Sequence, residues 1–532
     1  MTEIMKKIKN IILCAAALMA FAACDKVLDL GPIDYPATGS FWKEEAQVQT
    51  FLNGLMTHLR GDYNALYLLG EVRGGTLKEG SSIENVSLNY ARLILNQLDK
   101  DNTGVTNWNG YYARILQVNH YIDELENACT FMDEATRNHY LAPGYGLRAY
   151  YYFMLYRTYG GVPLETTVKL MDGSIDINNL YLVRSTAEET LAQIKKDINA
   201  SEEAYGNDRS LDRSFWNYFA TEILKAHIYL WSAKVTTNFS NSSGTHTATA
   251  SAEELNIAKT ALMNIVKSGK FSLVDFASLY DWDNKECDEI ILSLHFDYTE
   301  TTNDAGNYYY QASIWCNSFY DEDGNQLGDP LNLCGGGMHR NEWKESFVKS
   351  FDKADARRSV TFHECYSSAD EDSRVFGSSM LKRMGHVEGS TRYADSDIHI
   401  YRYADVLLLL AEVENALGNT DAVPAYVNQI RERAYGSDYP VYADGGFAAN
   451  ELAILKERDK EFVAEGSRWF DLIRMQDASK KPLAFSAEAA YPVTYGGAAT
   501  AVLSSGSDYL LLWPVDVTVL TNDTEIEQTV GY

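Results

Sequence analysis

The sequence has few cysteines and no paired cysteine motif. Seven occur in 532 residues, two of them in the apolar N-terminal segment, and no two cysteines show C-x-x-C spacing. The other five are Cys129, Cys287, Cys316, Cys334 and Cys365. An odd, scattered set of this kind predicts buried thiols, and it argues against both a zinc site and a complete disulfide framework.

Positive charge is also scarce. The chain carries 46 Lys and Arg against 74 Asp and Glu, a net charge of −28. Such an acidic surface repels phosphate backbones, so we expect no nucleic-acid partner. After the N-terminal segment, no run of about eighteen apolar residues suggests a membrane-spanning helix. Aromatic residues are plentiful instead, with 36 Tyr, 20 Phe and 9 Trp, more than core packing alone requires.

The N-terminus has the pattern of a targeting segment. Three lysines at positions 6–9 precede the apolar run IILCAAALMAFAA, which ends at Ala23. Cys24 follows directly, in a setting that resembles the lipobox of bacterial lipoproteins, although Phe21 stands where Leu is usual. We expect residues 1–23 to be a signal peptide and Cys24 to be the lipidated first residue. The alternative is an ordinary cleaved signal in which Cys24 has no role.

Apolar residues recur at helical spacing through most of the chain. The pattern predicts helices over residues 43–59, 111–125, 133–156, 186–204, 215–232, 252–267, 399–417, 423–434 and 448–475. Helices strung along the chain in this way suggest tetratricopeptide-like units, without a clean 34-residue period. The aromatic rings of residues 150–159 lie at helical spacing, so we assign them to the core.

Residues 269–397 differ from this pattern, because Gly, Asn and aromatics dominate there. EIILSLHF at 289–296 predicts a strand, DEDGN at 321–325 predicts a hairpin turn, and YLLLWPV at 509–515 is strand-like. We therefore predict one mostly α domain over residues 24–532. Its parts are a helical scaffold (about 40–268 and 398–476), an irregular, aromatic-rich insertion (269–397) and a C-terminal tail (477–532).

Six stretches in order resemble the SusD/RagB family of outer-membrane nutrient-binding lipoproteins. They are ATGSFWKEEAQVQTFLNGL (37–55), LRAYYYFMLYRTYGGVPL (147–164), IYRYADVLLLLAEVENALGN (400–419), VNQIRERA (427–434), ERDKEFVAEGSRWFDLIRM (457–475) and the terminal LLLWPVDVTVLTNDTEIEQTVGY (510–532). Asp516 and Val530 depart from the family pattern, which commonly has proline at both places.

The resemblance implies a mostly α fold on a tetratricopeptide-like scaffold, displayed at the outer face of the outer membrane. It also implies a partner, a SusC-like TonB-dependent barrel transporter. Family members bind oligosaccharides, and some bind peptides, without cleaving them. The family has no shared catalytic residue set to transfer, and it implies no cofactor.

The charged stretch 457–475 has the residue types of an active site, but its spacing indicates structure. Glu457, Glu461 and Glu465 share one helix face, while Arg468 and Asp471 lie at i, i+3. Acids beside arginines would have depressed pKa values, which do not suit a general acid. The run from His363 to Cys365 lacks a second histidine at zinc spacing, so we expect no metal site there. No catalytic motif remains, and we predict that the protein is not an enzyme.

Aromatic residues in polar loops are the binding candidates. Sugar rings stack their C–H faces on aromatic rings, while their hydroxyls need polar groups around the rim. A Trp between two acids is hard to assign to a core, so Trp282 is the first candidate. The predicted ligand-binding residues are Trp282, Asp281, Asp283, Tyr309, Trp315, Arg73, Glu71 and Trp108. Arg73 has an alternative role, pairing with Glu71.

We therefore expect a lipid-anchored outer-membrane protein that binds oligosaccharides and passes them to a transporter. The alternatives are a peptide-binding member of the same family, an anchored hydrolase, and an adaptor that binds only proteins.

Overall fold

The computed structural model describes residues 41–79, 88–101, 108–168, 181–238, 245–303, 319–328 and 341–532. Helices dominate this part of the chain and strands are short, which confirms the mostly α prediction. None of the helices described there combines the length and the apolar character needed to cross a bilayer.

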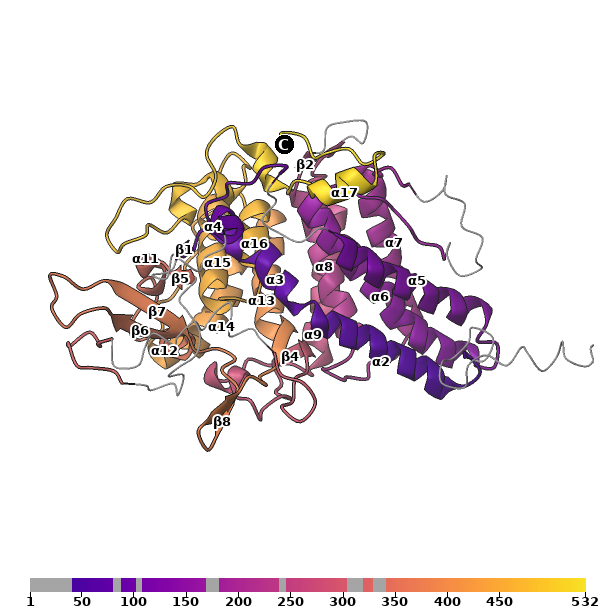
Figure 1. Ribbon diagram of the computed structural model, residues 1–532, viewed down its shortest axis with the longest axis horizontal. Coiled ribbons are helices and arrows are strands. Elements are labelled where there is room, and N and C mark those ends of the chain that lie inside the picture. Colours follow the sequence, from indigo (N-terminus) through magenta and orange to yellow (C-terminus); the bar gives the residue numbers. More distant parts are fainter. Residues whose placement is uncertain are drawn as a thin grey trace, which may run out of the picture.

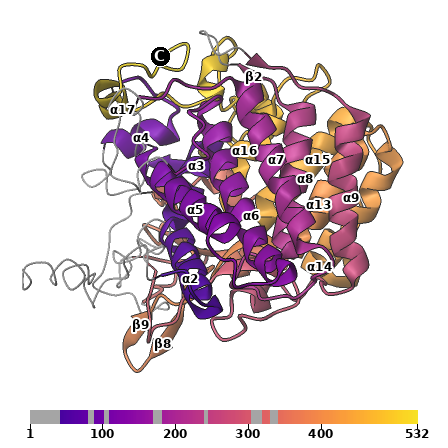
Figure 2. The same ribbon diagram turned by 90° about the vertical axis from the view of Figure 1, so that its right-hand side faces the viewer.

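The first half of the chain forms a stack of helices, drawn indigo to magenta in Figures 1 and 2. Consecutive members pack side by side, as in α5 with α6, α6 with α7, and α8 with α9. The helices are α2 (Glu45–Gly61), α3 (Tyr63–Gly70), α4 (Leu88–Ile94), α5 (Asn109–Asn127), α6 (Glu134–Tyr159), α7 (Ala187–Tyr205), α8 (Tyr218–Lys234) and α9 (Ala252–Ser268). Polar caps begin several of them: Thr186, for example, accepts a hydrogen bond from the backbone N–H of Glu189 in a capping box.

The aromatic rings of α6 are in the core, as predicted. Tyr150, Tyr151, Tyr152, Tyr156 and Tyr159 are all buried. One large apolar cluster includes residues from α6, α8, α13 and α16, so the two helical halves share a core.

The second helical half lies beside this stack, drawn orange in Figure 1. Within it, α13 packs against α14 and α15, and it also contacts α9 of the first stack. Its helices are α11 (Glu345–Val348), α12 (Ala356–Thr361), α13 (Tyr403–Ala416), α14 (Val423–Tyr435), α15 (Phe447–Glu461) and α16 (Arg468–Arg474). The short α17 (Val517–Asn522), drawn yellow, lies by the first stack instead. Short 3-10 turns include η1 (Val72–Gly74), η4 (Ala277–Tyr280) and η10 (Asp508–Leu511).

All described strands pair antiparallel in twos. The pairs are β1 (Leu77–Glu79) with β5 (Asn341–Trp343), β2 (Thr237–Asn238) with β3 (Thr245–His246), β4 (Ile290–Leu294) with β10 (Ile398–Arg402), β6 (Phe362–Tyr366) with β7 (Phe376–Met380), and β8 (His386–Glu388) with β9 (Thr391–Tyr393). The predicted strand at 289–296 is confirmed as β4, and the predicted turn at 321–325 is confirmed by a hydrogen bond from Asp321 N to Asn325 O.

Three sequence predictions are wrong in detail. The helix expected from residue 399 begins at Tyr403, because Ile398–Arg402 pairs with β4 and tertiary pairing overrides the local pattern. The strand-like run 509–515 is not a strand: it begins in η10 and continues as unpaired chain, with Trp513 N bonded to Thr158 O.

The third correction concerns the helix predicted over 448–475, which is two helices. Between α15 and α16 the chain turns through Ala464 (φ 60°) and Gly466 (φ 75°). A Cβ on Gly466 would lie 2.4 Å from Leu66 O, and one on Gly70 would lie 1.8 Å from Gly466 O. The backbone of α3 therefore approaches this turn at a distance that only glycine permits.

Candidate functional site

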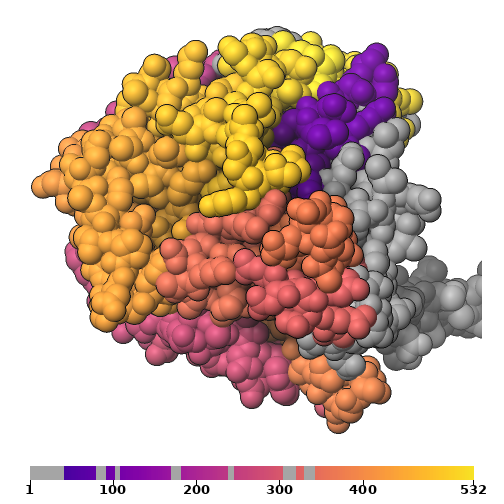
Figure 3. Space-filling model, turned by 90° about the vertical axis from the view of Figure 1, so that its left-hand side faces the viewer, coloured from indigo at the N-terminus to yellow at the C-terminus, as the bar shows by residue number. Residues whose placement is uncertain are grey.

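Four rings gather at the surface around the β8–β9 hairpin, which projects from the body in Figures 1, 2 and 3. The Trp282 ring stacks on His386 with centroids 4.1 Å apart and planes at 25°. His386 in turn stacks on Tyr393 at 5.3 Å and meets Tyr298 edge-on at 5.1 Å. We call Trp282, Tyr298, His386 and Tyr393 the aromatic platform. Trp282 remains 37% exposed and Tyr298 43% exposed, so the platform is open to solvent.

The 3-10 turn η4, which directly precedes Asp281 and Trp282 in the chain, fixes the position of Trp282. Leu279 is buried, and the Tyr280 hydroxyl donates to Glu465 Oε1 at 2.7 Å. Beyond η4 the chain turns, with Asn284 N bonded to Asp281 O and Asn284 Nδ2 bonded to Ser278 O. The indole of Trp282 therefore extends from a turn that hydrogen bonds of Tyr280, before it, and Asn284, after it, hold in place.

The hairpin supplies His386 and Tyr393 from opposite strands, where they form a cross-strand pair. At the base of the hairpin, Gly385 has φ 65°, and a Cβ there would lie 1.8 Å from Tyr393 O. His386 Nδ1 lies 2.9 Å from a carboxylate oxygen of the buried Asp395. This contact fixes the plane of the imidazole that the indole covers.

Carboxylates border the platform. Asp281 and Asp283 flank the indole, and both are exposed. Burial and the neighbouring Asp283 carboxylate raise the pKa of Asp281 above its usual value. Exposed rings beside hydrogen-bonding carboxylates can stack on the apolar face of a sugar while binding its hydroxyls.

Two family models match the chain. One, described as "SusD family", matches residues 280–532, and the other, described as "Starch-binding associating with outer membrane", matches residues 34–220. A solved SusD superfamily protein from Bacteroides fragilis is 35% identical to this chain, with a TM-score of 0.82, over 92% of this chain and 100% of its own. The chain belongs to the SusD family.

Two other proteins match over similar lengths. NanU of Bacteroides fragilis is 31% identical, with a TM-score of 0.77, over 94% of this chain and 100% of its own. The SusD-like protein P38 of Formosa agariphila is 26% identical over 89% of this chain and 93% of its own. These matches confirm the family that the ordered sequence blocks indicate, and the second family model connects it with starch binding and the outer membrane.

Three residues predicted to bind ligand lie in the interior of this SusD-family fold, so we leave them out of the site. Arg73 is 0% exposed, and its guanidinium lies over the rings of Trp469 and Trp513, 4.1 and 4.8 Å from their centroids. It donates to Asn96 Oδ1 at 2.7 Å and to the Leu510 carbonyl oxygen, so the alternative of pairing with Glu71 is not what the structure shows.

The other two are Glu71 and Trp108. Glu71 is buried, and this burial raises its pKa to about 8. The Trp108 ring is also buried and packs edge-on against Tyr112 and Tyr159. The polar loop pattern around these residues suggested exposure, whereas they fill spaces between helices.

The remaining predicted residues fall outside the described part of the chain. These are Tyr309, Trp315 and the lipidation candidate Cys24. Conversely, sequence reasoning missed Tyr298, His386 and Tyr393. The turn-forming Gly389-Ser390 marks the hairpin, but no local signal places its rings against Trp282, about a hundred residues earlier in the chain.

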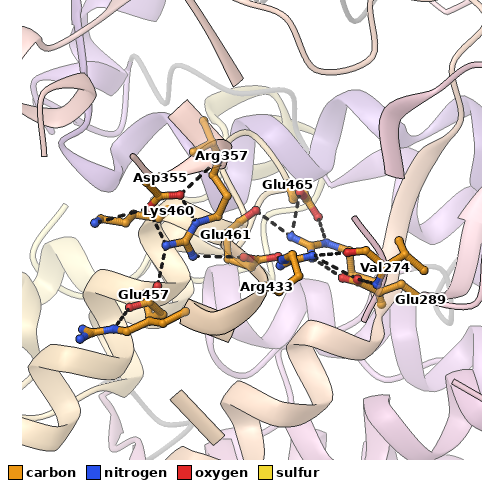
Figure 4. Close-up of polar contacts among 12 residues, drawn as sticks. Val274, Glu289, Asp355, Arg357, Arg433, Glu457, Lys460, Glu461 and Glu465 are labelled. Atoms are coloured by element: carbon orange, nitrogen blue, oxygen red, sulfur yellow. Dashed lines mark hydrogen bonds and ion pairs between the residues drawn. The ribbon is translucent and has the colours of Figure 1, made fainter. Parts of the chain in front are cut away.

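The charged stretch 457–475 contributes to a buried ionic network, as the structural interpretation predicted (Figure 4). Its members are Glu289, Asp355, Arg357, Arg402, Arg433, Glu457, Glu461 and Glu465. Arg402 lies 2.8 Å from Glu289 and 2.9 Å from Glu465, and Arg357 lies 2.7 Å from both Asp355 and Glu457.

The guanidinium groups of the network keep Glu461 and Glu465 ionised, whereas burial raises the pKa of Glu289 above its usual value. Burial alone would raise the pKa of Glu461, but the guanidinium groups of Arg433, Arg402 and Arg357 outweigh it and hold that pKa well below its usual range. Arg402 and Lys382 act in the same way on Glu465. Permanently charged carboxylates cannot serve as general acids at neutral pH.

One predicted pair in this stretch is wrong. Asp471 pairs with Arg474 at 2.8 Å and with Arg458 at 2.8 Å, while Arg468 pairs with Asp459. Because the chain turns before α16, Arg468 stands at the start of a new helix and faces α15. Earlier in the chain, Glu364 forms a bidentate pair with Arg358. No group of three metal-ligating side chains occurs among the described residues.

Proposed function

We propose that this SusD-family protein binds oligosaccharides at the aromatic platform, on the outer face of the outer membrane, and does not cleave them. The observation that carries the proposal is the exposed stack of Trp282 on His386, with Tyr298 and Tyr393 beside it. A contiguous exposed patch of rings is typical of a ligand-binding or interaction surface. The description of the matching family as starch-binding supports a saccharide as that ligand.

The proposal extends to the anchor and the partner. We infer that residues 1–23 are removed, that Cys24 is lipidated, and that the protein delivers its ligand to a SusC-like TonB-dependent transporter. Incorporation of labelled palmitate, lost in Cys24→Ala, would test the anchor. Copurification with a barrel transporter from outer membranes would test the partner.

Calorimetric titration with a panel of neutral oligosaccharides would test the site itself. We expect Trp282→Ala to weaken binding roughly tenfold, about 1.4 kcal/mol, because a stacking surface is lost. Tyr495→Ala is the matched control, since Tyr495 is an exposed aromatic outside the platform. Equal affinities for Trp282→Ala and the parent would refute the site.

Chromatography of the same mixtures would test the absence of catalysis. We expect the oligosaccharides to be recovered unchanged after long incubation. Release of new reducing ends, abolished by a single carboxylate substitution, would identify a hydrolase. Binding of peptides but of no saccharide in the panel would favour the peptide-binding alternative.

A further inference from the structure

A cavity of about 390 Å³ lies at the other end of the molecule from the platform. It is bounded by the end of α8, by β2, by the chain after α16 and by the C-terminal segment around η10. In both ribbon views, β2 and the β8–β9 hairpin lie at opposite ends of the body (Figures 1 and 2). Its volume is within the range of small-molecule sites.

The walls are mainly apolar. Trp231 forms part of them, and its Nε1 has no hydrogen-bond partner within the described part of the chain. The other apolar lining residues include Val235, Ile473, Leu511 and Leu512. A ligand here would therefore bury an apolar body.

Arg157, in the last turn of α6, lies between this cavity and a smaller one that Phe153 and Phe470 line, and its charge has no counter-ion among the described residues. Its guanidinium lies over the rings of Phe470 and Phe153, 3.9 and 4.4 Å from their centroids. One Nη atom lies 2.7 Å from Met154 Sδ, and Nε has no acceptor among the described residues. Burial lowers its pKa to about 10.

This arrangement resembles that of Arg73 and differs from that of four other interior arginines. Arg357, Arg402, Arg458 and Arg474 each contact at least two carboxylates. By contrast, no ion pair involves Arg157 within the described residues. Arg157 is half-buried, and a charge partly withdrawn from water without a counter-ion attracts an anion that reaches it.

The remaining charges around the cavity fit an anionic ligand. Lys234 is already neutralised by Glu412 at 2.7 Å and by Glu451 at 2.6 Å. Lys480 is exposed at the edge, with its ammonium over the Phe447 ring. Asp508, the acidic residue in the lining, is also exposed. The positive charge of Arg157 at this cavity is therefore without a counter-ion, although the chain as a whole has a net charge of −28.

We propose that this cavity is a second binding site, which takes a small organic carboxylate. The carboxylate pairs with the guanidinium of Arg157, in the geometry that favours two parallel hydrogen bonds. The apolar part of the ligand packs against the wall that Trp231, Ile473 and Leu512 provide. The site does not depend on the platform or on saccharide binding.

Benzoate and benzamide are suitable first probes, because they share a shape and differ in charge. We expect the melting temperature to rise with benzoate concentration, following the logarithm of one plus the ratio of ligand concentration to Kd, and benzamide to have no effect at equal concentration. Arg157→Met should weaken benzoate binding roughly tenfold or more, since the paired charge is lost. Arg209→Met is the matched control, because Arg209 also stacks on a ring, that of Tyr218, outside the cavity.

A crystal soaked with 4-bromobenzoate makes the test independent of how well the variants fold. We expect anomalous bromine density inside the cavity with the carboxylate at Arg157. Lys480→Gln, a surface change, should weaken benzoate binding roughly two- to threefold by removing an attracting charge. Equal responses to benzoate and benzamide, unchanged affinity in Arg157→Met, or bromine located only elsewhere would overturn the proposal. Saccharide titrations of Arg157→Met should match the parent, which separates this site from the platform.

Discussion

The ionic network and the aromatic platform are neighbours that use opposite chemistry. In the network, charged groups are buried and held by several partners each, as Arg402 is by Glu289, Glu461 and Glu465. In the platform, the exposed rings of Trp282 and Tyr298 pack on the half-buried rings of His386 and Tyr393. Tyr280 connects the two, because its hydroxyl bonds Glu465 and only one residue separates it from Trp282. The comparison teaches that the charges stabilise the support and the rings are left free for a ligand.

Breaking the network should have the largest effect on stability. Arg402→Met leaves three acids buried without that counter-ion, and we expect a loss of about 3–5 kcal/mol in the free energy of unfolding. Denaturant titration would measure it. Arg60→Met is the control, because its pair with the exposed Glu300 should contribute under about 1 kcal/mol. A loss no greater than that of the control would contradict the structural role of the network.

Lowering the pH should also destabilise the fold, through protonation of Glu461 and Glu465 in the network. The folded pKa values of Glu461 and Glu465 lie below the ordinary value of 4.5. Their contribution to stability is therefore complete above about pH 4.5 and is lost as the pH falls through the folded pKa values. We expect the denaturant midpoint to drop steeply below about pH 4.5, and less steeply in Arg402→Met. Parallel curves for parent and variant would show that other groups control acid unfolding.

Removing a platform ring should weaken binding and cost less stability than breaking the network. His386→Ala exposes the covered face of Trp282 and frees its rotation, so we expect saccharide affinity to fall by about 1 kcal/mol. The unfolding free energy should fall by about 1–3 kcal/mol, because the imidazole is only 11% exposed and its contact with the buried Asp395 carboxylate is lost. A large loss of stability with unchanged affinity would place His386 in the core support instead.

The smallest effect on binding should come from changing Asp281 and Asp283, the two carboxylates beside Trp282. Asp281→Asn with Asp283→Asn keeps hydrogen-bonding oxygens but removes both charges. For a neutral oligosaccharide we expect a change of no more than about threefold in Kd, because exposed charges contribute little. Calorimetry in low and high salt would measure it. A loss as large as that of Trp282→Ala would show that the carboxylates, not the rings, dominate binding.

The sequence predicts the helical part of this fold well and its tertiary contacts poorly. Periodicity locates α5 to α9 within a few residues, since each helix has its own apolar face. It misplaces the start of α13 because Ile398–Arg402 is fixed by pairing with β4, a contact that no local pattern contains. The same limit explains why one site prediction agrees with the structure and another does not. The DWDN setting of Trp282 correctly indicates exposure. The loop-like surroundings of Arg73 also suggest exposure, but the distant residues Trp469 and Trp513 enclose its guanidinium.

The β8–β9 hairpin gives two of the four rings of the platform from a short segment with Gly385 at its base. It contacts the rest of the protein through the His386–Asp395 pair and the stack of His386 on Trp282. We therefore expect that the sequence of the hairpin can be replaced without redesigning the helical core. Libraries confined to residues 387–392 would vary the shape offered to a ligand while His386 and Tyr393 stay in register. The protein thereby offers a route to new saccharide preferences that leaves folding almost untouched.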